Sequence, residues 1–250
     1  MNAIKIYGER NSGTNYIEKL VEKNIDIQIL RYYPGRWIGK FLRYEFMSGF
    51  LFELNKKKYL GWKHGKPKIR EINKFESSPL TIVTITKNPY TFLLSLYKRP
   101  YHYRGEKFTD FKDFLSRSWP TILRENCGLE KFSSPIDLWN EKNKAFLSLK
   151  HRVNKKVINL RYEDVVKNPE ETILTLSKIT GAPLKHSSQF QNVIDSTKGD
   201  DLVYSDYMDY YLNEKWKDKL HDEEIRMINE KLDIELVKAC GYELILSTEG

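Results

Sequence analysis

The order of apolar and polar residues predicts strands that alternate with helices along much of the chain. Four short segments rich in β-branched and aromatic residues are predicted as interior strands: Ala3–Tyr7, Tyr59–Lys63, Leu80–Thr86 and Val157–Tyr162. Their apolar residues stand partly in unbroken runs, which is typical of parallel strands that are buried on both faces. Helical patterns lie between some of these segments, so the sequence predicts an α/β fold with helices covering a parallel sheet.

Two of the predicted helices follow directly on strands. Just after the first strand, apolar residues from Tyr16 to Val21 recur with helical spacing. After the third strand, Asn88 is placed to cap a helix whose first turn contains Pro89, and apolar residues with helical spacing follow. Both patterns predict a helix that begins at the carboxyl end of a strand.

Two further helices are predicted in the C-terminal half. Asn168 and Pro169 repeat the same capping pattern, Glu171 is placed to close a capping box, and Gly181 ends the helix. The last helix is predicted to begin near Asp222 and to run without a break. Its apolar face consists of Ile225, Ile228, Leu232, Leu236 and Val237.

Length and composition favour one folded domain over residues 1–250. The chain has 250 residues and 40% hydrophobic residues, without repeats or low-complexity tracts. No apolar run is long enough to span a bilayer, and the predicted strand at Ala3 leaves no room for a signal peptide. Cys127 and Cys240 are far apart, and neither they nor the histidines have the spacing of a metal site. These features predict a cytoplasmic protein without a bound metal.

The net charge of +8 comes from 42 Lys and Arg against 34 Asp and Glu, and it is unevenly distributed. Basic residues crowd the segment Lys56–Lys74, which contains Glu71 as its one acidic residue. Such a segment suits a nucleic acid, an acidic lipid surface or a multiply charged small ligand, and it equally suits a solvated loop. Charge alone does not choose among these interpretations.

The segment Gly8–Asn15 lies between the first strand and the first helix and has two glycines five residues apart. This is the frame of a P-loop, in which backbone N–H groups at a helix N-terminus hold phosphate oxygens. Thr14 stands where a nucleoside triphosphatase has lysine, and Asn15 stands where it has the metal-binding hydroxyl. The segment therefore argues against ATP or GTP hydrolysis and fits an anionic donor held by backbone, hydroxyls and Arg10. The simpler interpretation is a tight turn whose hydroxyls only cap the helix.

Several motifs resemble the sulfotransferases that use 3′-phosphoadenosine 5′-phosphosulfate (PAPS). Asn11–Tyr16 resembles the loop that binds the 5′-phosphosulfate in that family. Lys87, followed by Asn88, Pro89 and a serine eight residues after the lysine, resembles the motif for the 3′-phosphate. Leu160–Asp164 resembles the strand and turn on the adenine side, and Gly241-Tyr242 resembles a common ending of bacterial members.

The resemblance implies a P-loop-like sulfotransferase fold, with a central parallel sheet between two helix layers (α/β/α). It also implies metal-independent binding of PAPS as the sulfuryl donor, with the bisphosphate PAP as product. The implied donor-binding residues are Arg10, Asn11, Ser12, Gly13, Thr14, Asn15, Tyr16, Lys87, Ser95 and Tyr162. Two positions depart from the family pattern. Asn11 occupies the place of the loop cation, with Arg10 one position earlier, and Lys87 replaces an arginine, which loses the bidentate fork.

Lys63 and His64 end the second predicted strand, where ligands bind in open α/β sheets. Some family members carry a histidine base in a Lys-x-His-x-Pro segment at this point, which the adjacent Lys63-His64 resembles without matching. Histidine titrates near neutrality and can take a proton from an acceptor hydroxyl. We therefore assign His64 as the base, with Arg10 and Lys63 stabilising charge on the leaving oxygen. A carboxylate base remains an open alternative.

The acceptor is less well defined by the sequence. Tyr97–Arg104 and Arg31–Arg43 combine aromatic and basic residues, which suits a glycan or glycolipid, single-stranded nucleic acid, or a surface loop. Three functions remain: a PAPS-dependent sulfotransferase acting on a small molecule or glycan, a P-loop kinase-like enzyme using ATP, and a non-catalytic basic module for polyanions. The sulfotransferase is favoured, and it requires neither a nucleic-acid partner nor a transmembrane segment.

Overall fold

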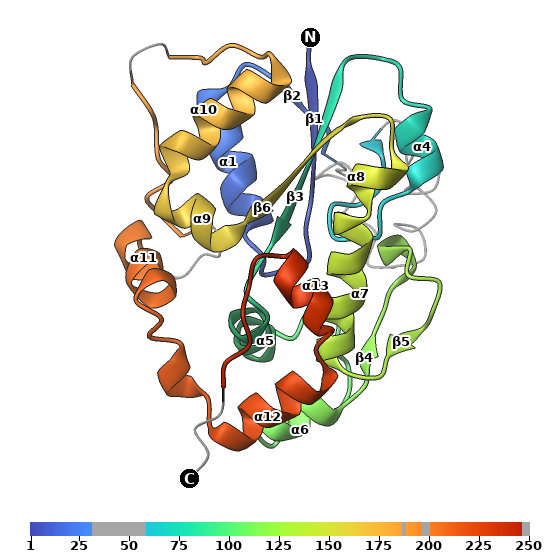
Figure 1. Ribbon diagram of the computed structural model, residues 1–250, viewed down its shortest axis with the longest axis vertical. Helices are drawn as coiled ribbons and strands as arrows, with labels where there is room; N and C mark the ends of the chain where they lie inside the picture. Colours follow the sequence, from blue (N-terminus) through green and yellow to red (C-terminus); the bar gives the residue numbers. More distant parts are fainter. Residues whose placement is uncertain (32–58, 187–188, 197–200, 247–250) are drawn as a thin grey trace, which may run out of the picture.

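The structure is a computed structural model that describes residues 1–31, 59–186, 189–196 and 201–246. Its main sheet has four parallel strands in the order β2-β1-β3-β6, and a two-stranded antiparallel sheet lies apart from it (Figure 1). The strands are β1 Ala3–Tyr7, β2 Gln28–Ile29, β3 Leu80–Thr86, β4 Trp119–Pro120, β5 Lys131–Phe132 and β6 Lys156–Arg161. The predicted parallel α/β architecture is confirmed.

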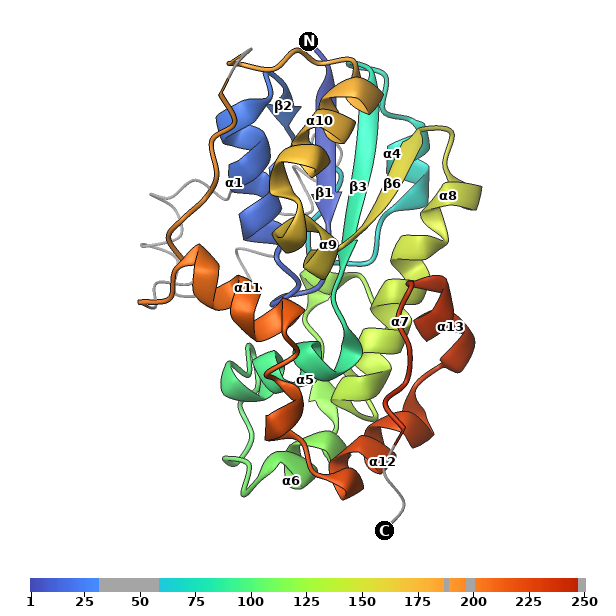
Figure 2. The same ribbon diagram turned by 60° about the vertical axis from the view of Figure 1, so that its left-hand side comes forward.

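Helices cover both faces of the main sheet, and a further group of helices lies beyond the carboxyl ends of its strands (Figures 1 and 2). The helices are α1 Thr14–Asn24, α4 Ile69–Asn73, α5 Pro89–Lys98, α6 Phe111–Ser116, α7 Pro135–Leu147, α8 Leu149–Arg152, α9 Tyr162–Lys167, α10 Pro169–Thr180, α11 Tyr204–Leu212, α12 Asp222–Lys231 and α13 Ile234–Ala239, with short 3-10 turns η1 Leu123–Glu125 and η2 Lys217–Lys219. In the described part of the chain, no helix is long and apolar enough to cross a membrane.

Alternation along the strands divides the apolar residues between the two faces of the sheet. Ile4 of β1 and Val83 of β3 pack against α1, α9 and α10, whereas Tyr7 and Ile82 pack on the opposite face with residues of α4 and α7. A third apolar cluster joins α5, α6, α7, α12 and α13 below the sheet. The sheet is therefore fixed on both faces, and its strand ends are held against the third cluster.

The predicted strand Tyr59–Lys63 is wrong. Leu60 and Gly61 have φ angles of 56° and 83°, in the left-handed region that a strand does not contain. The segment is nevertheless held beside the sheet, because the Lys5 side chain donates to the carbonyls of Leu30, Tyr59 and Gly61 at 3.1, 2.7 and 2.7 Å. Side-chain hydrogen bonds thus replace the predicted ladder, and the short strand β2 takes the place beside β1.

Two helix predictions also need correction. The Asn168 side chain does not cap α10, because this residue ends α9 and its N–H donates to the Asp164 carbonyl. The last predicted helix is two helices, since Leu232 is extended and the Asp233 side chain accepts the N–H of Leu236 to begin α13. The predictions at the ends of β1 and β3 are confirmed. Asn88 accepts hydrogen bonds from the N–H groups of Tyr90 and Thr91.

The strand order of the main sheet predicts a ligand crevice at one place. The chain leaves β1 toward β2 on one side, and β3 lies on the other side, so the strand order reverses between β1 and β3. Ligands in open parallel sheets bind outside the carboxyl ends of strands at such a reversal. The loop Gly8–Gly13 follows β1, and Lys87 follows β3, so these two sequence motifs flank the crevice. The segment Arg31–Arg43, apart from Arg31, lies outside the described residues, as do Lys56, Lys57 and Lys58.

Candidate functional site

The loop after β1 exposes the N-terminus of α1 to the crevice. Gly13 precedes the helix in a left-handed conformation, with φ 88°, and no side chain of the described residues caps the helix. Asn11 is also left-handed, with φ 65°. The first N–H groups of a helix have no intrahelical acceptor, so an uncapped N-terminus in a glycine turn favours an anion. This arrangement favours the anion-binding interpretation of Gly8–Asn15 over a capped turn.

Gly13 is held against an aromatic ring. A Cβ atom at this position would lie 2.2 Å from Cδ2 of Tyr162, the first residue of α9. Any side chain here would therefore push the loop away from the ring in addition to straining its backbone. The close approach fixes the loop relative to the carboxyl end of β6.

We expect Gly13→Ala to lower the free energy of unfolding by about 1–3 kcal/mol through backbone strain, with a further loss from the contact with Tyr162. Gly128→Ala is the matched control. Gly128 has φ 72°, but a Cβ there would meet no atom within 4 Å. Urea denaturation of the two variants measures the difference, and equal losses would contradict the role of the Tyr162 contact.

Arg10 is buried beside this loop. Its Nη1 lies 3.1 Å from Oε1 of Glu125, and its guanidinium lies 4.5 Å from the centre of the Trp62 ring. Its Nη2 is buried without a hydrogen-bond partner among the described residues. A buried guanidinium donor that has no acceptor is costly, and an anion at the loop would satisfy it.

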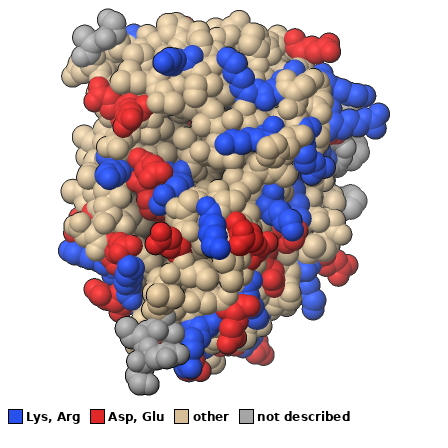
Figure 3. Space-filling view, in the orientation of Figure 1, with Lys and Arg blue, Asp and Glu red and all other residues tan. Residues whose placement is uncertain are grey.

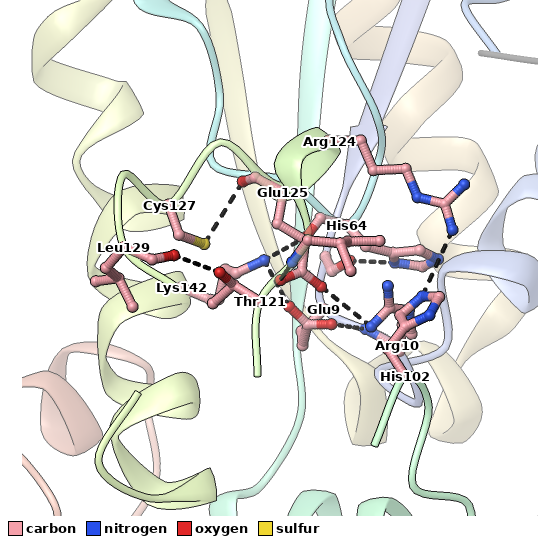
Figure 4. A network of polar contacts seen from close by, with 12 residues as sticks. Glu9, Arg10, His64, His102, Thr121, Arg124, Glu125, Cys127, Leu129 and Lys142 are labelled. Carbon is pink, nitrogen blue, oxygen red and sulfur yellow. Dashed lines mark hydrogen bonds and ion pairs between the residues drawn. The ribbon is translucent and has the colours of Figure 1, made fainter. Parts of the chain in front are cut away.

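Arg10 belongs to a group of two buried cations and two buried carboxylates (Figure 4). The fully buried Nζ of Lys142 contacts Oε2 of Glu9 at 2.9 Å and donates to the carbonyl of His64 at 2.6 Å. Oε1 of Glu9 accepts the backbone N–H of Arg10 at 2.7 Å. Burial lowers the pKa of Lys142, but Glu9 and Glu125 more than offset it and the pKa is raised. Lys142 on α7 thus ties the loop after β1 to His64.

The His64 ring lies against the same loop. Its Nδ1 is 2.7 Å from the carbonyl oxygen of Gly8, and the N–H of Gly8 donates to the carbonyl of Lys63. Burial, followed by the charge of Lys63, holds the pKa of His64 well below its ordinary value. The ring is therefore neutral near pH 7. Because a carbonyl only accepts, Nδ1 carries the hydrogen and Nε2 keeps a lone pair. A neutral histidine with a free lone pair has the state that a general base requires.

Lys63 contacts the first helix. Its Nζ lies 2.7 Å from Oδ1 of Asn15 and 2.7 Å from Oε2 of Glu18. The predicted site residues from the loop, from Lys63 and from His64 therefore gather at one place, although the segment that carries Lys63 is no strand. Glu9 and Glu125 are buried carboxylates beside the loop, and each is already paired with a cation.

Lys87 forms a second cationic position across the crevice. Its side chain is 1% exposed, and its Nζ donates to Oγ of Ser95 at 2.8 Å and to the hydroxyl of Tyr211 at 2.7 Å. Burial lowers the pKa of Lys87 to about 7, and the charge of Glu163 opposes this only partly. Two neutral hydroxyls do not compensate a buried ammonium, so the position favours an anion.

Tyrosine rings line a small pocket beside the loop. Tyr16 and Tyr204 stand nearly parallel, with 19° between the ring planes and 6.5 Å between the ring centres. Both rings line the pocket together with Gly13, Tyr162 and Asn11. Tyr162 also meets Tyr211 edge to face. These rings give the pocket an aromatic wall.

The sequence interpretation missed the residues that complete both positions. Tyr204 and Tyr211 belong to α11, where several tyrosines fall within nine residues, and that enrichment was a usable signal. Glu125 and Lys142 carried no such signal. They are far from the loop in sequence, and only the packing of η1 and α7 brings them to Arg10. Trp119, Trp139 and Trp216 are buried in the third cluster.

Comparisons with known proteins agree with the motifs. Residues 6–239 match the family model described as "Sulfotransferase domain". A sulfotransferase from Alicyclobacillus acidocaldarius is similar in structure, with 13% identity, a TM-score of 0.46, and coverage of 98% of this chain and 97% of that one. A sulfotransferase domain from the curacin biosynthetic pathway has 12% identity, a TM-score of 0.42, and coverage of 98% of both chains. No curated protein gives a significant match.

Proposed function

The chain belongs to the sulfotransferase domain family, and on that premise we propose that it transfers a sulfuryl group from PAPS to an acceptor hydroxyl. One observation carries the choice of donor. Two anion positions flank the crevice between β1 and β3, one at the uncapped loop with Arg10 and one at the buried Lys87. A donor with phosphate groups at both its 3′ and 5′ positions matches this pair.

The residues at each position fit the donor. The orphaned Nη2 of Arg10 and the helix N-terminus suit the 5′-phosphosulfate, and Lys87 with Ser95 suits the 3′-phosphate. The tyrosine rings beside the loop offer aromatic contacts for the adenine. Thr14 and Asn15 leave the loop without the lysine and hydroxyl that a triphosphate site uses, and the Asn15 side chain is engaged by Lys63.

The proposed reaction is an in-line displacement at sulfur. Nε2 of His64 takes the proton of the acceptor hydroxyl, whose oxygen forms the new O–S bond. The bond between sulfur and the bridging oxygen breaks, and its electron pair leaves with PAP. Arg10 and Lys63 stabilise the charge that develops on the bridging oxygen, and the backbone of Ser12–Asn15 holds the line of attack. An acceptor of the glycan or glycolipid class fits the aromatic and basic segment Tyr97–Arg104.

The two other functions make different demands on the site. An ATP-dependent kinase would require Mg²⁺ at the loop. A polyanion-binding module would require a broad basic surface, and the face drawn in Figure 3 carries Lys and Arg interspersed with Asp and Glu. Neither alternative uses a buried lysine such as Lys87 as an isolated second anion position.

Titration calorimetry with PAP in the presence and absence of Mg²⁺ tests the proposal. We expect saturable one-to-one binding of PAP that is unchanged by Mg²⁺, and weaker binding of adenosine 5′-phosphate, which lacks the group facing Lys87. Binding of ATP only with Mg²⁺ would support the kinase. Steeply salt-dependent binding of polyanions without a saturable PAP site would support the binding module.

A further inference from the structure

A second cavity lies next to the site and has no part in the donor assignment. It has a volume of about 590 Å³ and opens between the loop that follows α5 and the β4–β5 hairpin. This volume is within the range of sites that hold small molecules or sugars. Its lining includes Tyr103, whose ring packs against Phe108 and Trp119.

The charge of this cavity has one sign. Arg104, Arg117 and Lys131 line it, and no Asp or Glu does so among the described residues. Arg117 is paired at 2.7 Å with Asp113, which lies outside the lining, so its charge is largely compensated. Arg104 and Lys131 are exposed at the wall. Concave walls that carry cations and lack acids concentrate anions.

A chain of ring contacts joins the cavity to the proposed base. His102 lines the cavity, and its ring centre lies 6.5 Å from that of Trp62. Trp62 in turn meets the His64 ring edge to face at 5.0 Å. The guanidinium groups of Arg10 and Arg124 lie 4.5 and 4.2 Å from the centre of the Trp62 ring. Aromatic rings flanked by two guanidinium groups therefore connect the cavity to His64.

We propose that this cavity binds an acidic group of the acceptor, so that the enzyme sulfates a hydroxyl on an anionic sugar. This inference rests on the proposed function, because it places the reacting hydroxyl at His64. The acidic group lies in the cavity near Arg104 and Lys131. A carboxylate and a sulfate ester share the chemistry that these cations recognise.

Binding to the PAP-loaded protein tests the inference without depending on turnover. The probes are 4-nitrophenyl β-D-glucuronide, the corresponding glucoside 6-sulfate, and the uncharged glucoside, each followed by titration calorimetry. We expect the uncharged glucoside to bind at least about tenfold more weakly than the better of the two acidic probes, because it makes no charged contact. A preference between the two acidic probes identifies the acidic group.

The double variant Arg104→Glu/Lys131→Glu is the second arm. We expect it to lower the affinity for the preferred acidic probe by at least about tenfold and to leave the uncharged glucoside unchanged. The matched control is Lys150→Glu, at an exposed lysine of α8 that does not line the cavity. Equal binding of all three probes, or no effect of the double variant, overturns the inference. Failure of PAP to bind overturns the proposed function instead.

Discussion

The variant His64→Asn is expected to lower kcat by about 10²-fold or more and to leave the affinity for PAP nearly unchanged. The asparagine amide can still donate to the carbonyl of Gly8, as Nδ1 of His64 does at 2.7 Å, so the loop keeps its support. What is lost is the lone pair at Nε2. The measurement is turnover with labelled PAPS and the acceptor that a screen of sugars, lipids, phenols and peptides identifies.

The pH profile of the unaltered enzyme provides a second readout. A base works when it is neutral, so activity is lost as the pH falls through its pKa. Because the pKa of His64 in the free protein lies well below its ordinary value, we expect kcat/KM, which reports the groups of the free enzyme, to persist below pH 6.5. His151→Ala, at an exposed position on α8, is the matched control and should leave turnover unchanged. Near-full turnover of His64→Asn would assign the base to a carboxylate.

The variant Lys87→Met is expected to lower the affinity for PAP by at least about 30-fold, because the 3′-phosphate loses its buried cation. The affinity for adenosine 5′-phosphate should change little, so the ratio of the two affinities reports the role directly. Lys5→Met is the matched control. Lys5 is equally buried and burial lowers its pKa to about 7, but its partners are the carbonyls of Leu30, Tyr59 and Gly61, so its loss should leave the ratio of the two affinities unchanged. An unchanged ratio in Lys87→Met would contradict the assignment.

Because burial lowers the pKa of Lys87 to about 7, the binding of PAP is coupled to the protonation of this side chain. Below pH 7 the side chain is already charged, so it adds no pH dependence to PAP binding. Above pH 7 the free protein must take up a proton, and the affinity falls by up to about tenfold per pH unit. Calorimetry at pH 8 in buffers of different ionisation enthalpy measures this uptake. Lys87→Arg should abolish it, since arginine remains protonated.

Much of the site could be predicted from the sequence because its central parts are local. A strand, a glycine turn and a helix predict an anion position at Gly8–Asn15, whatever the rest of the chain does. Asn88 and Pro89 predict in the same way that α5 starts directly after Lys87. The serine eight residues after Lys87 was assigned by resemblance, and two turns of α5 bring it to 2.8 Å from the lysine.

The strand prediction for Tyr59–Lys63 shows where local patterns fail. Its composition is that of a strand, but Lys5 binds its carbonyls and holds it in a conformation that includes left-handed residues. The sequence does not indicate which carbonyl groups accept hydrogen bonds from a lysine within β1. The hydrogen bonds of Lys5 to the preceding segment and the contact of His64 with Gly8 position the His64 ring, although the expected strand is absent.

The sequence by itself determined the alternation of strands and helices, the glycine loop after β1 and the lysine after β3, because each depends on neighbours within a few residues. Only the tertiary structure decided that Glu125 faces Arg10, that Lys142 joins Glu9 to His64, and that Tyr211 reaches Lys87. The protonation states follow from the same packing. Burial sets the pKa of Lys87 and of His64, and burial depends on contacts between segments far apart in the chain.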